Sequence, residues 1–299
     1  MDRFHLMSVY IAVAEEQGFA SAARRLGMSP PAVTRAIAAL EQRLGVRLLN
    51  RTTRHVRTTE AGHRYLEDAR RVLDEVDAVD QAVSGINAEP RGHLAITAPV
   101  MFGRMFVMPG IVEYLERYPA TEISALLLDR DVNLLAEGID VGVRIGELPD
   151  SSMRALKVGS VRQVVCASPG YLRRYGKPER PQDLSAHTLI NSSAVSDVPN
   201  WIFNAAQGMR NQRIQPRLVV TSNAAAVEAA LADFGLTRLL SYQVAPQLAD
   251  GKLQIVLEEF EVEPRPIHIV HREGRFASPT VRSFIDFIAA RLRGDSLLN

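Results

Sequence analysis

The sequence predicts an α/β protein with an all-helical head, and three observations lead to that prediction. Apolar residues within residues 1–58 recur at spacings of three and four, which is typical of short amphipathic helices. Residues 59–88 keep this spacing without a break, as one long helix would. From residue 89 onward, strand-like apolar segments alternate with helical ones, which indicates a largely parallel sheet.

The charge of the chain is divided unevenly between these parts. The formal net charge is only +1, but residues 1–58 hold nine arginines against four acidic residues, a net charge of +5. Residues 59–90 hold three arginines and eight acidic residues, a net charge of −5. The head is therefore expected to lie on an anionic polymer, whereas the rest of the chain is not.

The head is expected to hold three helices, over residues 4–17, 19–26 and 30–44. Glycine accepts the left-handed conformation that ends helices, so Gly27 and Gly45 should stop the second and the third. Ser29 is a favoured N-cap residue, and Pro30 suits the first helical position because its missing N–H is not needed there. The apolar stripe of the third helix consists of Val33, Ile37, Leu40 and Leu44.

The opposite face of the third helix is small, polar and basic. It carries Pro31, Thr34, Arg35, Ala38 and Gln42. Two short helices joined by a tight glycine turn, the second with such a face, are typical of a helix-turn-helix that enters a DNA groove. Residues 54–57 alternate like a small β-wing, whose expected phosphate contacts are Arg47, Arg51, Arg54 and Arg57. The alternative is a solvated basic face on an ordinary helical bundle.

The head resembles the DNA-binding domain of LysR-type transcriptional regulators. The matching residues are Gly18-Phe19, Ala22-Ala23, Leu26, Ser29, Pro31-Ala32-Val33-Thr34, Ile37, Leu40-Glu41, Leu44-Gly45, Leu48, Arg51 and Thr59-Glu60-Ala61-Gly62. The resemblance implies that residues 1–58 form a winged helix-turn-helix. Its DNA contacts are then expected from Ser29, Pro30, Pro31, Thr34, Arg35, Ala38, Arg51, Arg54 and Arg57.

The head departs from the family pattern at three positions. Pro30 stands where the family usually has glutamine, so the resemblance does not carry the whole of the family's base recognition over to this chain, because proline has no side-chain donor. Leu49 replaces the usual phenylalanine, which affects only packing, and Gly18 replaces the usual serine cap.

Residues 59–88 are expected to form a linker helix that begins at Thr59 as its N-cap. The repeat follows a period of 3.5 residues, which is typical of a coiled-coil seam, over Tyr65, Ala69, Val72, Val76, Val79, Val83 and Ile86. The alternative is an amphipathic helix docked on its own domain. A dimer is favoured because helix-turn-helix pairs read symmetric half-sites, and the family resemblance implies the same. Gly85, Asn87 and Pro90–Gly92 then mark a hinge.

The remaining residues, 89–299, read as alternating strands and helices. Strands are expected at 93–99, 123–128, 139–145, 161–167, 218–221, 253–257 and 267–270. Helices are expected at 103–117, 131–137, 224–232 and 279–291.

This region resembles the effector domain of the same family, which is similar to periplasmic solute-binding proteins of the two-lobed, type II kind. The resemblance rests on segments such as "LAEGIDVGVRIGELPDSS" and "SPTVRSFIDFIAARL". It implies a first lobe of residues 89–161 and 267–299 and a second lobe of residues 162–266. Two crossover strands near 160–163 and 264–267 are then expected to join the lobes.

Ligands of such folds bind where strands end and helices begin. The candidate effector-binding residues are Pro99, Val100, Met101, Arg144, Ile145, Ser222 and Asn223, with Trp201 and Phe203 covering the cleft. Arg144 offers a planar fork of donors that suits a carboxylate, so the expected ligand is a small organic anion, and Trp201 and Phe203 favour an aromatic one. The alternatives are core packing for each residue, and for Arg144 an ion pair with Glu147 or Asp150.

Catalytic and metal sites are not expected. His268 and His271 lie three apart on a strand and so point to opposite faces, which makes a poor metal pair. No phosphate loop, nucleophile elbow or cysteine cluster occurs, and the single Cys166 is expected to be an inert core residue. The chain is therefore expected to be no enzyme and to carry no cofactor.

The resulting expectation is a cytoplasmic regulator, because neither a signal peptide nor a membrane-spanning run of residues is seen. Its expected partners are an interrupted palindromic operator in double-stranded DNA, a small-molecule effector, RNA polymerase and further copies of itself, first as a dimer and then as a tetramer. Two alternatives stay open: an enzyme with a DNA-binding head, and an architectural DNA-binding protein without an effector.

Overall fold

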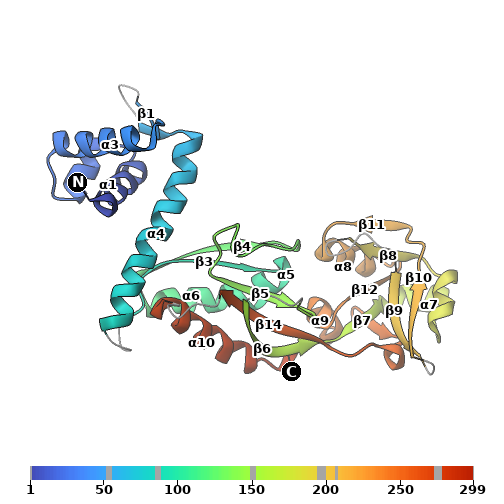
Figure 1. The fold of residues 1–299 in the computed structure, drawn as a ribbon. Helices are drawn as coiled ribbons and strands as arrows, with labels where there is room; N and C mark the ends of the chain where they lie inside the picture. Colours follow the sequence, from blue (N-terminus) through green and yellow to red (C-terminus); the bar gives the residue numbers. More distant parts are fainter. Residues whose placement is uncertain are drawn as a thin grey trace. The chain divides into compact units, whose positions relative to one another are not determined.

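The computed structural model describes residues 2–51, 56–84, 89–148, 153–193, 200–205, 208–272 and 278–298 (Figure 1). The chain divides into two compact units, Met1–Ala88 and Glu89–Asn299. Each unit has its own hydrophobic core, and each is taken by itself below.

The first unit contains the three short helices, the two-stranded wing and the long helix that the sequence predicts. The elements are α1 (Arg3–Glu16), α2 (Phe19–Arg25), α3 (Pro30–Leu44), β1 (Leu49–Arg51), β2 (Val56–Thr58) and α4 (Glu60–Ser84). The two wing strands pair antiparallel, with Asn50 opposite Arg57. The core gathers the predicted stripes, since Leu6, Tyr10 and Val13 of α1 pack with Val33, Ile37 and Leu40 of α3.

Helix α3 begins and ends where its capping and stop residues predict, but two expectations about it need correction. Gly45 adopts the left-handed conformation with φ of 69°, and Pro30 occupies the first helical position. Ser29 stands at the N-cap position, but its hydroxyl makes no capping hydrogen bond. Leu44 was expected in the buried stripe and is 41% exposed, because it lies in the last turn, beyond the reach of the core.

The start of α4 is fixed by a cap and by a close approach. Thr59 Oγ1 accepts a hydrogen bond from Gly62 N at 2.9 Å, which confirms the predicted cap. A Cβ atom at Gly62 would lie 2.0 Å from the carbonyl oxygen of Leu48, so only glycine fits there. The Tyr10 hydroxyl donates to the carbonyl oxygen of Gly62 at 2.8 Å and ties α1 to the first turn of α4.

The second unit is built on two five-stranded sheets. The first has the order β4-β3-β5-β14-β6 and comprises β3 (Gly92–Ala98), β4 (Thr121–Leu127), β5 (Val141–Ile145), β6 (Met153–Val161) and β14 (Arg265–Arg272). The second has the order β11-β8-β12-β7-β13 and comprises β7 (Gln163–Ala167), β8 (Leu189–Ser192), β11 (Leu218–Val220), β12 (Leu236–Leu240) and β13 (Gln254–Val256).

The prediction of largely parallel sheets is right for only part of each sheet. In the first sheet β3 runs parallel to β4 and β5, whereas β14 runs antiparallel to β5 and β6. In the second sheet β8 runs parallel to β11 and β12, whereas β7 runs antiparallel to β12 and β13. The chain comes from the second sheet when it enters β14 of the first, and from the first sheet when it enters β7 of the second. We attribute the reversed direction of these two strands to this exchange.

Helices cover both sheets. The first sheet packs against α6 (Met108–Arg117) and α10 (Pro279–Arg293), which lie along the same side of it (Figure 1). One side of the second sheet packs against α8 (Asn223–Leu231) and α9 (Ser241–Ala249). Its other side is covered by α7 (Pro169–Tyr175), the 3₁₀ turn Pro181–Ala186 and the hairpin of β9 (Asn200–Ala205) and β10 (Gly208–Arg213).

The predicted helix over 103–117 begins earlier and contains a wider turn. Its first turn is α5 (Val100–Phe102), and the residues Gly103–Val107 that follow have π-helical hydrogen bonding before α6 begins. Met108 N donates to the carbonyl oxygen of Gly103. Pro109 has no N–H to continue the α-helical ladder, so a wider turn directly before it is physically reasonable.

The helix predicted over Asp131–Glu137 is wrong. The side chain of Asn133 accepts hydrogen bonds from the backbone N–H groups of Leu135 and Ala136, both at 3.1 Å. Asparagine side chains offer the backbone an alternative to the helical ladder, and here a short turn replaces the helix.

The chain passes between the two sheets at Arg162, between β6 and β7, and returns before Arg265. At the first passage Arg162 N donates to Ser241 Oγ at 3.2 Å, and Ser241 N donates to the carbonyl oxygen of Arg162 at 2.8 Å. Both passages lie at the places expected for the crossover strands.

Candidate functional site

One face of α3 is exposed along its whole length. All six candidate residues on this helix and its cap are exposed, namely Ser29, Pro30, Pro31, Thr34, Arg35 and Ala38. The opposite face is buried through Val33, Ile37 and Leu40. The Thr34 hydroxyl donates to the carbonyl oxygen of Pro30 at 3.0 Å, so Arg35 is the long donor side chain on this face.

The acidic side chain nearest to this surface in the sequence is used inside the fold. Glu41 Oε1 accepts hydrogen bonds from the backbone N–H groups of Leu48 at 2.8 Å and Leu49 at 3.1 Å. The carboxylate therefore holds the turn between α3 and β1. Exposed arginines of the head include Arg24, Arg25, Arg35, Arg43, Arg47 and Arg57, so the head keeps a basic surface.

Of the four arginines predicted to contact phosphates here, the structure describes the side chains of Arg47 and Arg57, and both are exposed. Arg57 is exposed on β2, opposite Asn50. Arg51 lies on β1 opposite Val56, but its side chain is outside the described part of the structure, and Arg54 is outside the described residues altogether.

The N-terminus of α5 lies at the end of β3, where the sequence predicts ligand contacts. Pro99 is the N-cap residue and Val100 is exposed. Val100 N donates to Asp129 Oδ1 at 3.0 Å, so a carboxylate of the protein already meets this helix end. Met101 is only 8% exposed and packs in the core of the first sheet, which corrects its assignment as a ligand contact.

Arg144 is half-buried and bonded to backbone. Its Nη2 donates to the carbonyl oxygen of Val132 at 2.9 Å and its Nη1 to that of Val143 at 3.4 Å. Burial lowers the pKa of the guanidinium, and the carboxylates of Asp131 and Glu137 oppose that shift. Among the described residues, Arg144 forms no hydrogen bond or ion pair with Glu147, and Asp150 lies outside them. The neighbouring Ile145 packs against the core.

Strand register places two more basic side chains beside Arg144. His268 of β14 stands directly opposite Arg144 of β5 and directly opposite Lys157 of β6. Side chains directly opposite each other project from the same face of a sheet, with Cβ atoms about 5 Å apart. Within the described part of the chain, the buried Nδ1 atom of His268 has no hydrogen-bond partner. Sequence reasoning missed this row, because strand order is not visible in the sequence.

Trp201 and Phe203 do not cover a cleft, which corrects that expectation. They are 4% and 2% exposed and pack in the core between the second sheet and the β9–β10 hairpin. Trp201 Nε1 donates to Asn191 Oδ1 at 3.4 Å. The guanidinium of Arg238 lies 5.1 Å from the centre of the Phe203 ring and donates to the carbonyl oxygen of Ile202. The alternation of residues 201 and 203 within a strand was a signal of such burial.

Ser222 and Asn223 are engaged at the start of α8. Ser222 is exposed and its hydroxyl accepts a hydrogen bond from Ala225 N at 3.4 Å, as an N-cap does. Asn223 is buried in the first turn of the helix.

Among the described residues, no group of three histidine, cysteine or acidic side chains could hold a metal ion. In the same residues, no helix is both long and apolar enough to cross a membrane. Cys166 is fully buried, and that burial raises the pKa of its thiol to about 12.

Comparisons with known proteins match both units. A family model described as "Bacterial regulatory helix-turn-helix protein, lysR family" matches residues 4–63, and one described as "LysR substrate binding domain" matches residues 87–293. The regulator CrgA of Neisseria meningitidis serogroup B is 30% identical over 287 residues, covering 96% of each chain. The activator AaeR of Escherichia coli K12 is 33% identical over 274 residues, covering 91% of this chain and 88% of that protein.

Solved structures agree over the whole length. The structure of CrgA, a LysR-type transcriptional regulator from Neisseria meningitidis, has a TM-score of 0.63 at 30% identity, covering 97% of this chain and 99% of that one. The full-length Vibrio cholerae virulence activator AphB has a TM-score of 0.62 at 26% identity, with the same coverage. Both units are thus matched by relatives that are named as regulators, and this chain belongs to the LysR-type family of transcriptional regulators.

Proposed function

We propose that this DNA-binding transcriptional regulator reads an interrupted palindrome as a dimer and changes transcription when a small organic anion binds between the two lobes of its substrate-binding domain. The observation that carries the ligand class is the row formed by Arg144, His268 and Lys157. It acts in the cytoplasm, with RNA polymerase as the partner on which it exerts its effect.

The DNA-binding part of the proposal rests on the exposed face of α3. Double-stranded DNA admits a helix in its major groove, and the residues that reach base edges lie at the N-terminal part of such a helix. Thr34 and Arg35 occupy that part of α3, and both are exposed. Ser29, Pro31 and Ala38 are small and allow close approach, while Arg51, Arg54 and Arg57 contact phosphates from the wing.

The self-association part of the proposal rests on residues 59–88. The predicted seam is used in two ways: Tyr65 packs on the head of the same chain and Ala69 is buried, while Val72 is 36% exposed. The dimer contact therefore begins at Val72 and continues along α4. A tetramer then forms through the second units, residues 89–299.

The ligand-binding part of the proposal rests on basic groups whose donors are not all used within the described structure. Arg144 uses two of its donors for backbone oxygens, Lys157 is exposed, and His268 has an unpartnered nitrogen beside them. An arginine fork with further donors at its side suits a carboxylate. The ligand binds beside this row rather than at the N-terminus of α5, where Asp129 would repel it. With Trp201 and Phe203 buried, aromatic character is not required of the ligand.

The test is a thermal-unfolding titration with defined ligands. The probes are a panel of mono- and dicarboxylates and, for each carbon skeleton, the corresponding amine. Bound ligand raises the melting temperature. At a ligand concentration of one hundred times the dissociation constant, the free energy of unfolding increases by about 2.7 kcal/mol. At least one carboxylate is expected to stabilise the wild type, and this effect should be lost in Arg144→Ala and kept in the exposed control Arg174→Ala.

Two results would contradict the proposed ligand. One is a carboxylate that stabilises Arg144→Ala as much as it stabilises the wild type. The other is stabilisation by amines alone, which would make the ligand a cation.

A further inference from the structure

Glu15 occupies an electrostatically unfavourable place in α1. It lies in the last turn of the helix, where the carbonyl ends of the peptide dipoles repel a negative charge, and no basic residue of α1 offsets it there. An acidic residue at such an unfavourable helix position is expected to make stabilising contacts with other parts of the fold.

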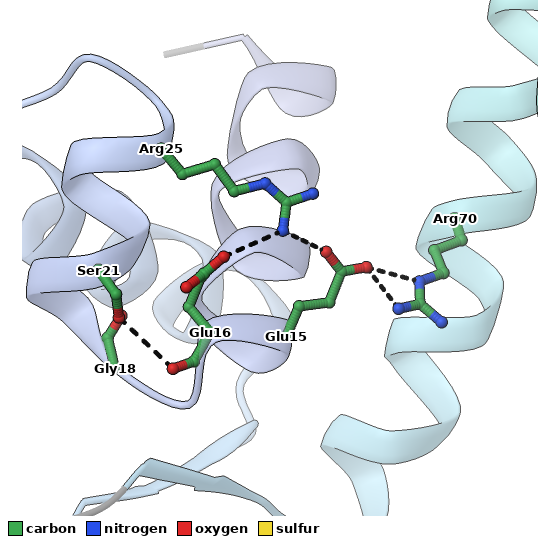
Figure 2. Close-up of polar contacts among 6 residues, drawn as sticks. All are labelled: Glu15, Glu16, Gly18, Ser21, Arg25 and Arg70. Carbon is green, nitrogen blue, oxygen red and sulfur yellow. Dashed lines mark hydrogen bonds and ion pairs between the residues drawn. The ribbon is translucent and has the colours of Figure 1, made fainter. Parts of the chain in front are cut away.

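Figure 2 shows what that arrangement is: the carboxylate of Glu15 lies between two arginines from two other helices. Arg25 Nη1, from α2, donates to Oε2 at 2.6 Å. Arg70, from α4, donates to Oε1 through Nε at 3.1 Å and also through Nη2. Each oxygen of one carboxylate thus holds a different helix.

The bonds from the arginines outweigh burial at Glu15. Partial burial alone would raise the pKa of the carboxyl, but the hydrogen bonds from Arg70 and Arg25 leave the pKa below its ordinary value. The neighbouring Glu16 is more peripheral: among the described residues its carboxylate pairs with Arg25 alone, at the longer distance of 3.5 Å.

Arg70 marks the point where α4 leaves the head. Before it, α4 is docked: Tyr65 meets Tyr10 edge to face with ring centres 5.5 Å apart, and Ala69 is buried. After it, Val72 is exposed. Among the described side chains of α4, the contact between Glu15 and Arg70 is therefore the anchor farthest along the linker helix on the head that carries α3.

The direction in which α4 leaves the head has a large effect at its far end. Residues 72–84 form a helix roughly 20 Å long at a rise of 1.5 Å per residue. A tilt of about 10° at Arg70 would move that far end by about 3.5 Å, close to the ~3.4 Å rise of one base pair. A dimer joined through this part would register such a tilt as a change of half-site spacing.

We infer that Glu15 is a positioning residue that fixes the exit of the linker helix and thereby sets the spacing between half-sites that the dimer accepts. This inference rests on the proposed dimeric reading of a palindrome. It assigns to Glu15 no contact with DNA, because the carboxylate is already shared by Arg25 and Arg70.

The test measures the affinity of the full-length protein for a family of duplexes. The duplexes carry the selected palindrome with its own spacer, with one base pair added, with one removed, and as a single half-site. Glu15→Gln removes the charge while keeping the shape, and Arg70→Met removes the linker arm. Glu16→Gln is the matched control because it removes one negative charge from the adjacent position.

The expected result is a loss of spacing preference without a loss of half-site binding. The ratio of affinities between the native and altered spacers should fall by about threefold or more in Glu15→Gln and Arg70→Met, as expected for losing a small network of exposed ion pairs. Half-site affinity should stay within about twofold of the wild type. Glu16→Gln should retain the wild-type ratio, and Arg70→Lys, which keeps the charge, should retain most of it.

Two results would overturn the inference, and a third would concern the proposed function instead. An unchanged ratio in Glu15→Gln would remove the positioning role. An equal loss of half-site and full-site affinity, with a lowered melting temperature, would make Glu15 a stabilising residue only. A wild type without any spacing preference would contradict the dimeric reading itself.

Discussion

Cys166 shows at the scale of one residue how burial decides chemistry. It lies on β7 in the core beneath α8 and α9, is fully buried, and has a thiol pKa raised to about 12 by that burial. The thiolate is the reactive form of cysteine, so between pH 7 and 9 the folded protein should hold almost none of it. A sensing role for this cysteine is therefore not expected.

The corresponding measurement is the rate of reaction with an aromatic disulfide reagent. We expect a reaction far slower than that of a free thiol throughout pH 7 to 9, with no levelling of the rate near pH 8.5, and full reaction in denaturant. A rapid reaction of the native protein, with a pH dependence centred near 8.5, would mean that Cys166 is accessible and ionised.

Single residues also show where prediction from sequence stops. The exposed positions of α3 were predicted correctly because a helical period fixes which side chains share a face. The proposed ligand residues were harder, because burial in a sheet depends on what packs on each face. Met101 and Trp201 proved to be core residues, and the neighbours of Arg144 could not be named until the register of β5 and β14 was known.

At the scale of elements, the wing offers a test of phosphate binding. Arg57 is exposed on β2 and faces no acidic partner across the strand pair, where Asn50 stands. A phosphate contact carries no sequence information but releases counterions. Arg57→Ala should therefore weaken binding to all DNA sequences alike and lower the slope of log affinity against log salt by about 1.

The control for the wing is Arg173→Ala, which removes an equal charge from α7 of the other unit. It should leave the salt slope unchanged. The assignment of Arg57 to phosphate would be wrong if its replacement altered base preference at one position and left the salt slope as it was. The same behaviour is expected of Arg54, the next basic residue of the wing.

The elements themselves were predictable in proportion to their local signals. The helices of the head have caps, glycine stops and clear stripes, and they were predicted to within a few residues. The turn at Asn133 replaced a predicted helix because one side chain satisfied two backbone donors there. Strands β8 and β12 were missed because they are short, fully covered on both faces and therefore lack alternation.

At the scale of the second unit, Tyr242 links the two sheets. It lies in α9, which packs on the second sheet, yet its ring is fully buried beside Phe102 of α5 and Phe106, in the core of the first sheet. Removing a buried aromatic side chain of this kind costs about 3–5 kcal/mol. Tyr242→Ala should lower the free energy of unfolding by about that amount, as measured by denaturant titration.

The comparison is Ile202→Ala, an exposed apolar residue on β9. Its replacement should change the free energy of unfolding by less than about 0.5 kcal/mol. If Tyr242→Ala were equally mild, the contact between α9 and the first sheet would not contribute to stability.

The mixed strand direction of both sheets has its origin in the same connection between them. The chain enters β7 from the first sheet and β14 from the second, and no local sequence pattern predicts such an exchange.

The central claim for the whole molecule is that it reads DNA as a symmetric pair of heads through the exposed face of α3. The most direct measurement is selection of bound duplexes from a random-sequence library, with wild type and Arg35→Ala in parallel at one salt concentration. The wild type should enrich an interrupted palindrome whose half-site centres lie a whole number of helical turns apart, about 10 base pairs per turn. Arg35→Ala should still bind bulk DNA but lose about 1–3 kcal/mol of discrimination per half-site. An asymmetric motif, or the same palindrome selected equally well by Arg35→Ala, would contradict the account.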